Sequence, residues 1–416
     1  MKYLDIFNVI IDIIHNDYSG CKDKAGIGNH EKFLEIIKKS DHMTDYDFMC
    51  LVREYLLAFC DGHLGFFSNN NMDFTNGFVA RRYEDRLYVE SAELESGFQL
   101  GDAILKIDGK TIPDLESIYG QYMQNQPWER QTWKEVIKKG SVCTVISKTG
   151  EIKNVQLLHL NIKSKPSIYE YKNLSDKVCI ITLSDFINES GILNLINKHR
   201  KEIESKDVMI IDVRNNSGGS DSAYFPLLKY IFKDNCTLNE LLQGEDIYVN
   251  YSKRNCEGRI AIMDEMVKKG ADEETVKLIE YMKTKINKNM GKGFIKEDDN
   301  EFDFEIEGQD RPLKVYILSD KYCGSSGDSF VHLCKKSKKV TVVGRNTKGL
   351  TDYSNCTLSV LGDFSLCYPT SRDSAIDKGK GIGGIGVAVD KYIPWTPEAI
   401  EEDIDLKYVM DEIKQK

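Results

Sequence analysis

Three short stretches of the sequence combine glycines with side chains that can carry out nucleophilic or acid–base chemistry. They are residues 61–65 (Asp-Gly-His-Leu-Gly), residues 212–220 (Asp-Val-Arg-Asn-Asn-Ser-Gly-Gly-Ser) and residues 323–330 (Cys-Gly-Ser-Ser-Gly-Asp-Ser-Phe). Acyl transfer requires a nucleophile, a base that activates it and N–H groups that stabilise the oxyanion. Each stretch can supply one of these three components, and each also has a purely structural interpretation.

The stretch 212–220 lies between an apolar strand-like run and an apolar helix around residues 224–231. Two glycines in such a turn leave backbone N–H groups able to face a developing negative charge. Asp212 and Arg214 are expected to pair locally and fix the turn. The structural alternative is a tight turn that needs positive φ. A nucleotide is disfavoured, because the pattern G-x-x-x-x-G-K-[ST] is absent.

The stretch 323–330 follows a predicted strand at 315–318 and opens a helix with Phe330, Val331, Leu333 and Cys334. A hydroxyl at the N-terminus of a buried helix, flanked by glycines, is well placed to be a nucleophile, and the helix dipole helps to stabilise an oxyanion. The alternative is that Ser-Ser-Gly-Asp forms an ordinary helix N-cap. Cys323 lies two residues before Ser325, which raises the question whether oxidation or alkylation of its thiol blocks the site.

The stretch 61–65 contains His63, one of the seven histidines. Glycines flank this position at the end of a predicted helical segment, so the imidazole can project into a cleft. Histidine titrates near neutral pH and is therefore a frequent general base. Taken singly, the position fits a structural role equally well.

The elements that would position these residues change character along the chain. Residues 1–60 read as helices, with apolar stripes at Leu4, Phe7, Ile10, Ile11 and Ile14, at Phe33, Ile36 and Ile37, and at Leu51, Tyr55, Leu56 and Phe59. From about residue 73, short apolar runs at 87–89, 103–107 and 142–146 predict strands, and Asp108-Gly109 predicts a hairpin turn.

Beyond Pro166 the pattern predicts an alternation of strands and helices. The runs 178–183, 208–213, 315–318 and 340–343 are continuously apolar, as in strands buried on both faces, so an α/β core with parallel pairing is expected. A polar helix is predicted over 188–203. Residues 235–310 are rich in Lys, Glu and Asn and mostly helical, notably 261–288. This composition predicts an insertion or lid over the core. The alternative is a solvent-exposed helical extension without a role at the site.

The composition excludes several classes of function. The 416 residues suggest two or three domains. A net charge of −10 without a basic run argues against nucleic acid as a partner. The 11 cysteines include no C-x-x-C pair, so they are expected to be mostly reduced thiols and not zinc ligands. We see no secretory pattern and no membrane-spanning run of ~18 apolar residues, so a soluble cytoplasmic protein with no membrane partner is expected.

Residues 97–110 (Gly-Phe-Gln-Leu-Gly-Asp-Ala-Ile-Leu-Lys-Ile-Asp-Gly-Lys) resemble the most recognisable stretch of PDZ domains. The order of all the motifs resembles the C-terminal processing and tricorn-type serine peptidases: D-x-H, a PDZ-like module, D-x-R-x-N-x-G-G, G-S-S-G-D at 324–328 and G-x-x-T-x-G at 344–349. The resemblance implies an α/β multi-domain fold. Its expected parts are a helical segment (1–72), a PDZ-like β module (73–162) and a crotonase-like (ClpP/crotonase) peptidase core (163–416) with the helical insertion.

The resemblance also implies roles for individual residues. Ser325 matches the nucleophile, in preference to Ser326, and His63 matches the general base. The N–H of Ser326 and that of Gly218 or Gly219 would bind the oxyanion. Members with a Ser–Lys dyad carry Lys directly after the T-x-G element, where this chain has Leu350. Lys348 lies in the wrong place for that role, so the histidine type is favoured.

The sequence departs from the family at the acid that orients the histidine. Relatives carry Glu just before a G-x-G-V-x-P-D stretch, where this chain has Gly383, and Val389 replaces the Pro. Asp373 and Asp377 are the nearest upstream carboxylates and the candidates for the third acid. Loss of the orienting acid can cost several orders of magnitude in rate.

These observations predict a serine endopeptidase that cleaves peptides or unfolded protein segments through an acyl-enzyme, without a metal or cofactor. An extended peptide is expected to enter as a strand, with the PDZ-like module as a second contact. A catalytically impaired peptide-binding module and another acyl hydrolase on the same core are the alternatives. The family includes monomers and homo-oligomers, and nothing in the sequence chooses between these states.

Overall fold

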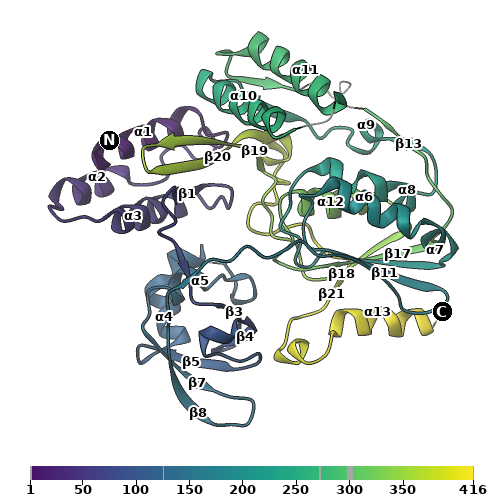
Figure 1. Ribbon diagram of the computed structural model, residues 1–416, viewed down its shortest axis with the longest axis horizontal. Helices are drawn as coiled ribbons and strands as arrows, with labels where there is room; N and C mark the ends of the chain where they lie inside the picture. The colour runs from purple at the N-terminus through teal and green to yellow at the C-terminus, as the bar shows by residue number, and fades with distance from the viewer. Residues whose placement is uncertain (1, 125, 271–272, 298–302, 416) are drawn as a thin grey trace. The chain divides into compact units, whose positions relative to one another are not determined.

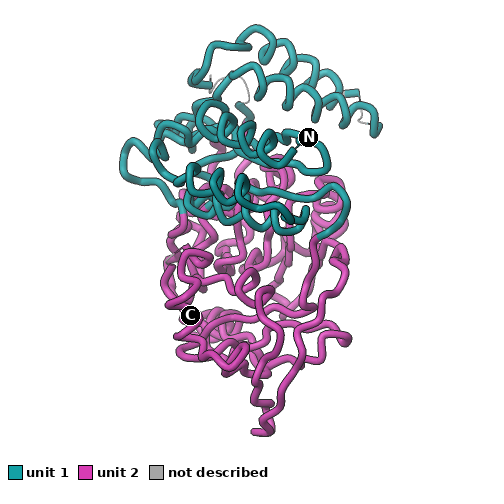
Figure 2. The backbone as a smooth tube through the Cα atoms, turned by 90° about the vertical axis from the view of Figure 1, so that its left-hand side faces the viewer, with its two compact units in different colours: residues 1–72, 238–304, 350–383 teal, residues 73–237, 305–349, 384–416 magenta. Residues whose placement is uncertain are grey.

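We describe a computed structural model of the chain, which covers residues 2–124, 126–270, 273–297 and 303–415 (Figure 1). The chain forms two compact units (Figure 2). Unit 1 comprises residues 1–72, 238–304 and 350–383, and unit 2 comprises residues 73–237, 305–349 and 384–416. Each unit is therefore assembled from segments that are distant in sequence, and we describe each one separately.

Unit 1 contains a small antiparallel sheet with helices. Its helices are α1 (Tyr3–Asn16), α2 (His30–Lys39), α3 (Asp45–Leu57), α9 (Leu238–Leu241), α10 (Lys253–Lys268) and α11 (Glu273–Asn289). Its strands are β1 (Gly65–Ser68), β14 (Ile247–Asn250), β15 (Phe294–Lys296), β19 (Tyr353–Leu361) and β20 (Phe364–Asp373). The sheet order is β1-β20-β14-β15, and β19 pairs with the other edge of β20 along most of its length.

The core of unit 1 forms where the three N-terminal helices cover this sheet. Phe48 on α3 lies edge-on to Phe66 on β1 and to Phe364 on β20, and α1 buries Phe7 and Ile10 completely. The three predicted helices are thus confirmed. One predicted stripe is partly wrong: Ile36 on α2 is 39% exposed, because Phe33 and Ile37, four residues apart, already fill the buried face of this short helix.

The predicted helical stretch over 261–288 is confirmed, and it is divided between two helices. It consists of the C-terminal half of α10 and nearly all of α11. Gly270 follows α10 with a φ of +96°, a conformation that favours glycine and ends a helix. The two helices and β14 share a cluster of buried residues that includes Cys256, Met263, Ile279 and Ile286, so this insertion has a small core of its own.

Unit 2 contains the predicted α/β core. Its sheet has the order β10-β11-β12-β17-β18-β21. The strands are β10 (Tyr169–Asn173), β11 (Val178–Leu183), β12 (Val208–Asp212), β17 (Lys314–Ser319), β18 (Val340–Gly344) and β21 (Lys391–Tyr392). The four central strands pair in parallel, which confirms the parallel pairing predicted from their apolar runs.

Helices cover both faces of this sheet: α6, α8 and α12 lie on one side and α13 on the other (Figure 1). The helices of this core, including the short α7, are α6 (Glu189–Lys198), α7 (Arg200–Ser205), α8 (Phe225–Ile231), α12 (Ser326–Cys334) and α13 (Ile404–Lys414). The predicted helix 188–203 is therefore two helices that meet at His199. Val409 of α13 packs against Ile210 and Tyr316 of the sheet. The carboxyl ends of β12 and β17 both lead into the stretches that could carry chemistry.

Residues 73–162 form a β-rich module within unit 2. A sheet in the order β3-β4-β5-β7-β8, with β6 paired to β5, surrounds a core that includes Trp133. The elements are β3 (Phe78–Tyr83), β4 (Arg86–Ala92), β5 (Ala103–Ile107), β6 (Lys110–Thr111), β7 (Val142–Ile146), β8 (Ile152–Gln156), α4 (Ile112–Tyr119) and α5 (Lys134–Ile137). Asp108 and Gly109 both have positive φ, as the predicted hairpin turn requires.

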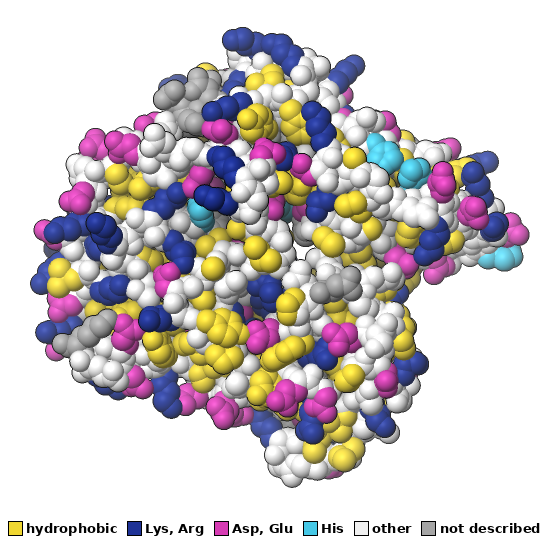
Figure 3. Space-filling view, turned by 180° about the vertical axis from the view of Figure 1, so that it is seen from behind, with side chains coloured by type: hydrophobic (Ala, Val, Ile, Leu, Met, Phe, Trp, Pro, Cys, Tyr) yellow, Lys and Arg dark blue, Asp and Glu magenta, His cyan; other side chains and the backbone are white. Residues whose placement is uncertain are grey.

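Four short strands complete the fold: β2 (Phe74–Thr75) pairs with β9 (Leu160–Asn161), and β13 (Cys236–Thr237) pairs with β16 (Glu305–Ile306). In the part of the chain that the structure describes, no helix is both long and apolar enough to cross a membrane. Acidic and basic side chains are interspersed over the face drawn in Figure 3. The predicted three-part division stays a prediction; residue 72 ends both its first segment and the first stretch of unit 1.

Candidate active site

Ser325 occupies a strained turn between β17 and α12 in unit 2. Its φ of 59° and ψ of −123° lie in a region that non-glycine residues rarely adopt and that is often found at functional sites. The residue stands directly before the first turn of α12, so its hydroxyl is at the positive end of the helix dipole. The neighbouring Ser326 is 6% exposed and donates its hydroxyl hydrogen bond to the carbonyl of Gly219 at 2.9 Å. Ser325 is thus the more accessible of the two hydroxyl groups.

Asp328 fixes this turn from inside the protein. Its carboxylate accepts a hydrogen bond from the N–H of Ser325 at 2.7 Å and another from the N–H of Gly349 at 2.8 Å. The side chain is fully buried. The carboxylate therefore joins the Ser325 turn to the glycine that ends the G-x-x-T-x-G stretch. Sequence reasoning gave Asp328 no role, although the G-S-S-G-D pattern that contains it was the available signal.

Gly218 lies against the Ser325 turn so closely that no side chain fits. A Cβ atom on Gly218 would be 2.6 Å from Cβ of Ser325 and 3.2 Å from its Oγ. On Gly219 it would be 2.2 Å from the carbonyl oxygen of Phe186. Both glycines also have φ values (+90° and +148°) that disfavour other residues. The two glycines thus bring the main chain of the 212–220 turn up to the serine.

Asn216 sets the direction of the N–H groups in this turn. Its Oδ1 accepts the N–H of Gly218 at 2.9 Å, and its own carbonyl accepts the N–H of Gly324 at 3.0 Å. The Gly218 carbonyl accepts the N–H of Phe186 at 2.8 Å. The Gly218 carbonyl and the Gly219 N–H belong to the same peptide group. In a trans peptide these two groups point in opposite directions, so the N–H of Gly219 points away from Phe186. Sequence reasoning left Asn216 unassigned, although it belongs to the D-x-R-x-N-x-G-G pattern.

The predicted pairing of Asp212 with Arg214 is confirmed. Arg214 donates two hydrogen bonds to Asp212, of 3.0 and 2.7 Å, and two more of 2.7 Å to Asp403 just before α13. These charges raise the pKa of the arginine although its burial alone would lower it. The pairs fix the start of the glycine turn to β12 and to the C-terminal helix.

His63 lies in unit 1, after the end of α3. Its backbone N–H donates to Asp61 at 2.9 Å, and the hydroxyl of Tyr18 donates to the other oxygen of Asp61 at 2.8 Å. Burial raises the pKa of Asp61. Leu350 packs beside this turn, since a Cβ on Gly62 would be 2.7 Å from its Cδ2. The position where dyad relatives carry lysine therefore holds a packed apolar side chain.

The imidazole of His63 is held by a backbone carbonyl. Its Nδ1 lies 2.7 Å from the carbonyl oxygen of Tyr353 at the start of β19. A carbonyl oxygen only accepts, so Nδ1 carries a proton, and in the neutral imidazole the lone pair is then on Nε2, the form that a general base needs. No sequence signal identifies such a partner, because every residue has a carbonyl group.

The two predicted third acids have other contacts in unit 1. Asp377 forms an ion pair with Arg372 at 2.6 Å, and Asp373 accepts the N–H of Ala375 at 2.7 Å, which caps a short helix. Gly383, at the position of the family's Glu, donates its N–H to Asp352 at 2.9 Å. A carboxylate therefore lies near this position, but it is bound to main-chain N–H groups.

A buried network of charges supports the Ser325 turn in unit 2. Asp320, directly after β17, pairs with Arg81 of the β module and with Arg345 after β18, at 2.7 and 2.9 Å. Arg345 also pairs with Asp405 of α13 at 2.7 Å. Burial alone would raise the pKa of Asp320, but the two arginines lower it well below its ordinary range. The network thus connects the β module to the loop that leads to the serine.

Arg130 is a second contact between the β module and the core. Its guanidinium donates hydrogen bonds to the carbonyls of Thr347 and Lys348 at 2.9 Å and, through Nε, to that of Gly384 at 2.9 Å. The backbone N–H of Lys348 donates to the carbonyl of Cys323 at 2.6 Å. The module therefore holds the G-x-x-T-x-G loop as well as the serine loop.

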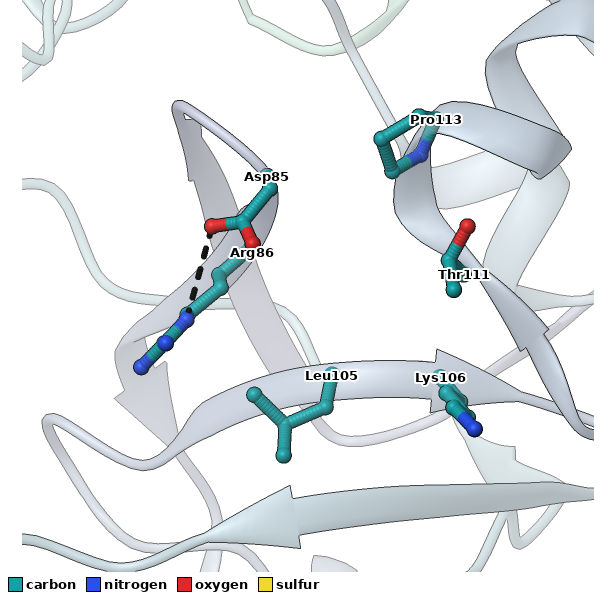
Figure 4. Close-up of a pocket in the computed structure, with 6 residues that line it drawn as sticks. All are labelled: Asp85, Arg86, Leu105, Lys106, Thr111 and Pro113. Atoms are coloured by element: carbon teal, nitrogen blue, oxygen red, sulfur yellow. Dashed lines mark ion pairs between the residues drawn. The ribbon is translucent and has the colours of Figure 1, made fainter.

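The β module also has a surface pocket of about 270 Å³ between its strands and the start of α4 (Figure 4). Asp85, Arg86, Leu105, Lys106, Thr111 and Pro113 line it. Asp85 and Arg86 form an ion pair at 3.4 Å, so the charges of the wall are largely matched. Among the described residues, no group of three or more His, Cys, Asp or Glu side chains is arranged to hold a metal ion.

A serine at a helix N-terminus, in a strained turn against a glycine-bearing strand end, defines a serine hydrolase on an α/β core. Residues 177–393 match the sequence profile of peptidase family S41, and the chain belongs to that family. It is a serine peptidase, which confirms the predicted enzyme class and the predicted C-terminal processing and tricorn-type family.

Solved structures resemble the whole chain. Mature CPAF has a TM-score of 0.69 and 13% identity over 99% of this chain and 96% of its own, and CPAF complexed with lactacystin has 0.68 and 13% over 99% and 97%. The photosystem II D1 C-terminal processing protease has 0.46 and 14% over 96% and 94%. No curated protein sequence gives a significant match. At these identities the likeness to CPAF shows the fold.

Proposed function

We propose that this serine peptidase is an endopeptidase whose nucleophile is Ser325 and which works through an acyl-enzyme. One observation carries the proposal: the main chain of Gly218 touches the strained Ser325 turn at the N-terminus of α12. The hydroxyl attacks the scissile carbonyl, and the carbonyl oxygen becomes an oxyanion. The N–H groups of Gly219 and Ser326 bind it, because that of Gly218 is already bonded to Asn216.

We infer that His63 is the general base. Its Nε2 accepts the proton of the Ser325 hydroxyl as the C–O bond forms, and returns it to the leaving amine as the C–N bond breaks. A water molecule then releases the acyl group by the same route. The hydrogen bond from Nδ1 to Tyr353 supports this assignment, because it selects the tautomer that can accept a proton at Nε2.

The Tyr353 carbonyl takes the orienting role that the missing Glu has in relatives. A carbonyl stabilises the imidazolium less than a carboxylate does, because it carries only a partial charge. Asp373 and Asp377, the carboxylates that the sequence predicts for this role, are the alternative to the carbonyl. Variants Asp373→Asn and Asp377→Asn test them: if either acts as the third acid, turnover falls by several orders of magnitude.

We propose that residues 73–162 are a PDZ-like module and that residues 163–416 have the crotonase-like arrangement. The antiparallel order β3-β4-β5-β7-β8 and the parallel order β11-β12-β17-β18 support these assignments. Substrates on this proposal are extended peptides or unfolded protein segments, which such a module takes as an added strand. A cytoplasmic site of action is a further expectation from the sequence, which is compatible with both a monomer and a homo-oligomer.

A fluorophosphonate probe tests the nucleophile, because it reacts with an activated serine. We expect the intact protein to be labelled and to cleave an unfolded protein. Ser325→Ala abolishes both, whereas Ser326→Ala keeps the labelled serine. Labelling that persists in Ser325→Ala, or that disappears only in Ser326→Ala, overturns the assignment. An unlabelled intact protein that binds peptides without cleaving them indicates the impaired binding module instead.

The base is tested by His63→Gln, which keeps a polar side chain but cannot take up a proton. We expect kcat to fall by about 10²–10⁴-fold, the usual contribution of general base catalysis, with little change in KM. His159→Gln is the matched control, because this ring stacks on Phe74 in the β module. Equal losses in both variants would contradict the role of His63.

A further inference from the structure

Two cysteines occupy neighbouring positions on β19 and β20 in unit 1. Cys356 is opposite Pro369, and Cys367 is opposite Leu358. Residues opposite one another and residues two apart along a strand share a face of the sheet, so both cysteines lie on one face as diagonal neighbours. Diagonal positions are close enough for side chains to meet, and each thiol shifts the pKa of the other.

The electronic state of this pair favours reaction with an oxidant. The interaction between the two thiols raises the pKa of Cys356 and lowers that of Cys367. Cys367 is therefore the more readily deprotonated of the two thiols, as expected of the attacking cysteine in a dithiol that forms a disulfide. Both side chains are partly exposed, so a small oxidant can reach them.

The other candidate, Cys323 beside Ser325, lacks these properties. It is completely buried, and burial raises its pKa well above the ordinary range. An inaccessible, protonated thiol reacts slowly, so the predicted sensitivity of the site through Cys323 is not supported. Cys334 is likewise fully buried with a raised pKa. The Cys356–Cys367 pair stands apart from both.

The pair lies on the strands that hold His63. Cys356 is three residues after Tyr353, whose carbonyl binds Nδ1 of the imidazole. Cys367 is opposite Gly65, two residues after His63. The charge of Asp61, which binds the His63 N–H, acts on both thiols. A change in the spacing of the two cysteines therefore acts directly on the segments that orient the imidazole.

We propose that Cys356 and Cys367 are a redox-active dithiol, and that a peroxide converts them to a disulfide that lowers peptidase activity reversibly. The sulfur of Cys367 attacks one peroxide oxygen, the O–O bond breaks and water leaves, which gives a sulfenic acid. The sulfur of Cys356 then attacks that sulfur, the S–O bond breaks and a second water leaves. Two thiols lose two electrons in all, and one hydrogen peroxide is reduced to two waters.

The bond is detected independently of activity. Trypsin releases residues 349–372 as one peptide that contains both cysteines, and cleavage before Asp363 separates them. After treatment of the intact protein with hydrogen peroxide, we expect this peptide to lose two hydrogens in mass and to stay joined after the second cleavage until dithiothreitol is added. Cys236, also partly exposed, is the control for general oxidation. Oxidation at Cys236 with no bond between Cys356 and Cys367 overturns the proposal.

The effect on activity rests on the proposed function. Diagonal cysteines must move closer to form a bond, and we expect the oxidised enzyme to lose about 10²-fold in kcat, the cost of a ~1 Å misplacement, with recovery in dithiothreitol. Cys356→Ser and Cys367→Ser should each keep the activity of the reduced enzyme and resist peroxide, whereas Cys236→Ser stays sensitive. A disulfide that leaves kcat unchanged overturns the regulatory half. An enzyme that is inactive even when reduced contradicts the proposed function, while the mapped disulfide stands.

Discussion

Arg81 and Asp320 form a buried two-bonded ion pair, with distances of 2.7 and 3.0 Å, although they are 239 residues apart in sequence. Arg81 belongs to β3 of the β module, and Asp320 begins the loop that leads to Ser325. Their side chains are 1% and 7% exposed. The module is thus part of the support of Ser325, the proposed nucleophile, so we expect loss of the module to affect catalysis on substrates that never touch it.

The first prediction is that Arg81→Met destabilises the protein by about 3–5 kcal/mol, because it leaves the Asp320 carboxylate buried with only part of its compensation. Urea unfolding measures this loss. We also expect the kcat for a short ester substrate to fall, because the loop that leads to Ser325 loses part of its support. Arg86→Met is the control: its partner Asp85 is 68% exposed, so the change should stay below about 1 kcal/mol.

The double variant Arg81→Met with Asp320→Leu separates stability from catalysis. Replacing both charges by apolar side chains should recover much of the free energy of unfolding, while kcat stays low because Arg345 has lost its partner at the loop. Full recovery of kcat in this variant would show that the pair contributes only stability.

The second prediction concerns the contact of Gly218 with Ser325. Gly218→Ala places a Cβ atom 2.6 Å from Cβ of Ser325 and 2.8 Å from the carbonyl oxygen of Gly324, so the turn must move. We expect fluorophosphonate labelling to be lost. Gly150→Ala is a matched control with nearly the same φ (+86° against +90°) and nothing within 4 Å of its Cβ. It should cost about 1–2 kcal/mol and keep full labelling.

Much of the fold could be predicted from the sequence, because each buried strand is recognisable by itself as a short apolar run. The runs 178–183 and 315–318 are apolar at nearly every position, and both became central parallel strands. Helix ends were harder to predict. The stretch 261–288 keeps helical composition throughout, and only Gly270 marks the break between α10 and α11, a position where glycine is also tolerated within a helix.

The candidate site was predictable only where function requires a residue type. The Gly218–Gly219 pair and Ser325 stand in recognisable patterns because only those residues fit. The partners that hold them were not predictable: Asp320 meets Arg81 from a distant strand, and Tyr353 acts through its carbonyl. Long-range ion pairs and main-chain acceptors leave no local spacing for sequence reasoning to detect.

The third prediction tests the carboxylate that supports the serine turn. In Asp328→Asn one carboxylate oxygen becomes an NH₂ group that faces a backbone N–H. The fully buried site then loses one of the hydrogen bonds to Ser325 or Gly349. An unsatisfied buried donor costs about 1–3 kcal/mol. We expect kcat to fall by at least about tenfold for each 1.4 kcal/mol by which the substitution weakens stabilisation of the transition state.

The control for Asp328 comes from the β module. Asp114 also occupies the third position of a helix, where its exposed carboxylate accepts the N–H of Thr111 at 3.2 Å. Asp114→Asn should change stability by no more than about 1 kcal/mol and leave kcat unaltered. If Asp328→Asn behaves in the same way, the buried carboxylate is an ordinary helix cap without a positioning role.

The fourth prediction concerns Lys321, which is 6% exposed and donates to the carbonyl of Gln131 at 3.0 Å. Burial, together with the nearby charge of Arg81, lowers the pKa of this lysine to about 7, whereas an unfolded chain gives about 10.4. Between pH 7 and 9 the unfolded chain therefore binds more protons than the folded protein. Stability should rise with pH, by at most about 1.4 kcal/mol per unit, and this contribution is lost as the pH falls through 7. Urea unfolding midpoints at pH 7, 8 and 9 measure this dependence of stability on pH. Lys321→Met should abolish the dependence. Lys110→Met, at an exposed position on β6, should leave it unchanged. A wild-type midpoint that is constant or falls over this range would show that Lys321 stays charged in the fold.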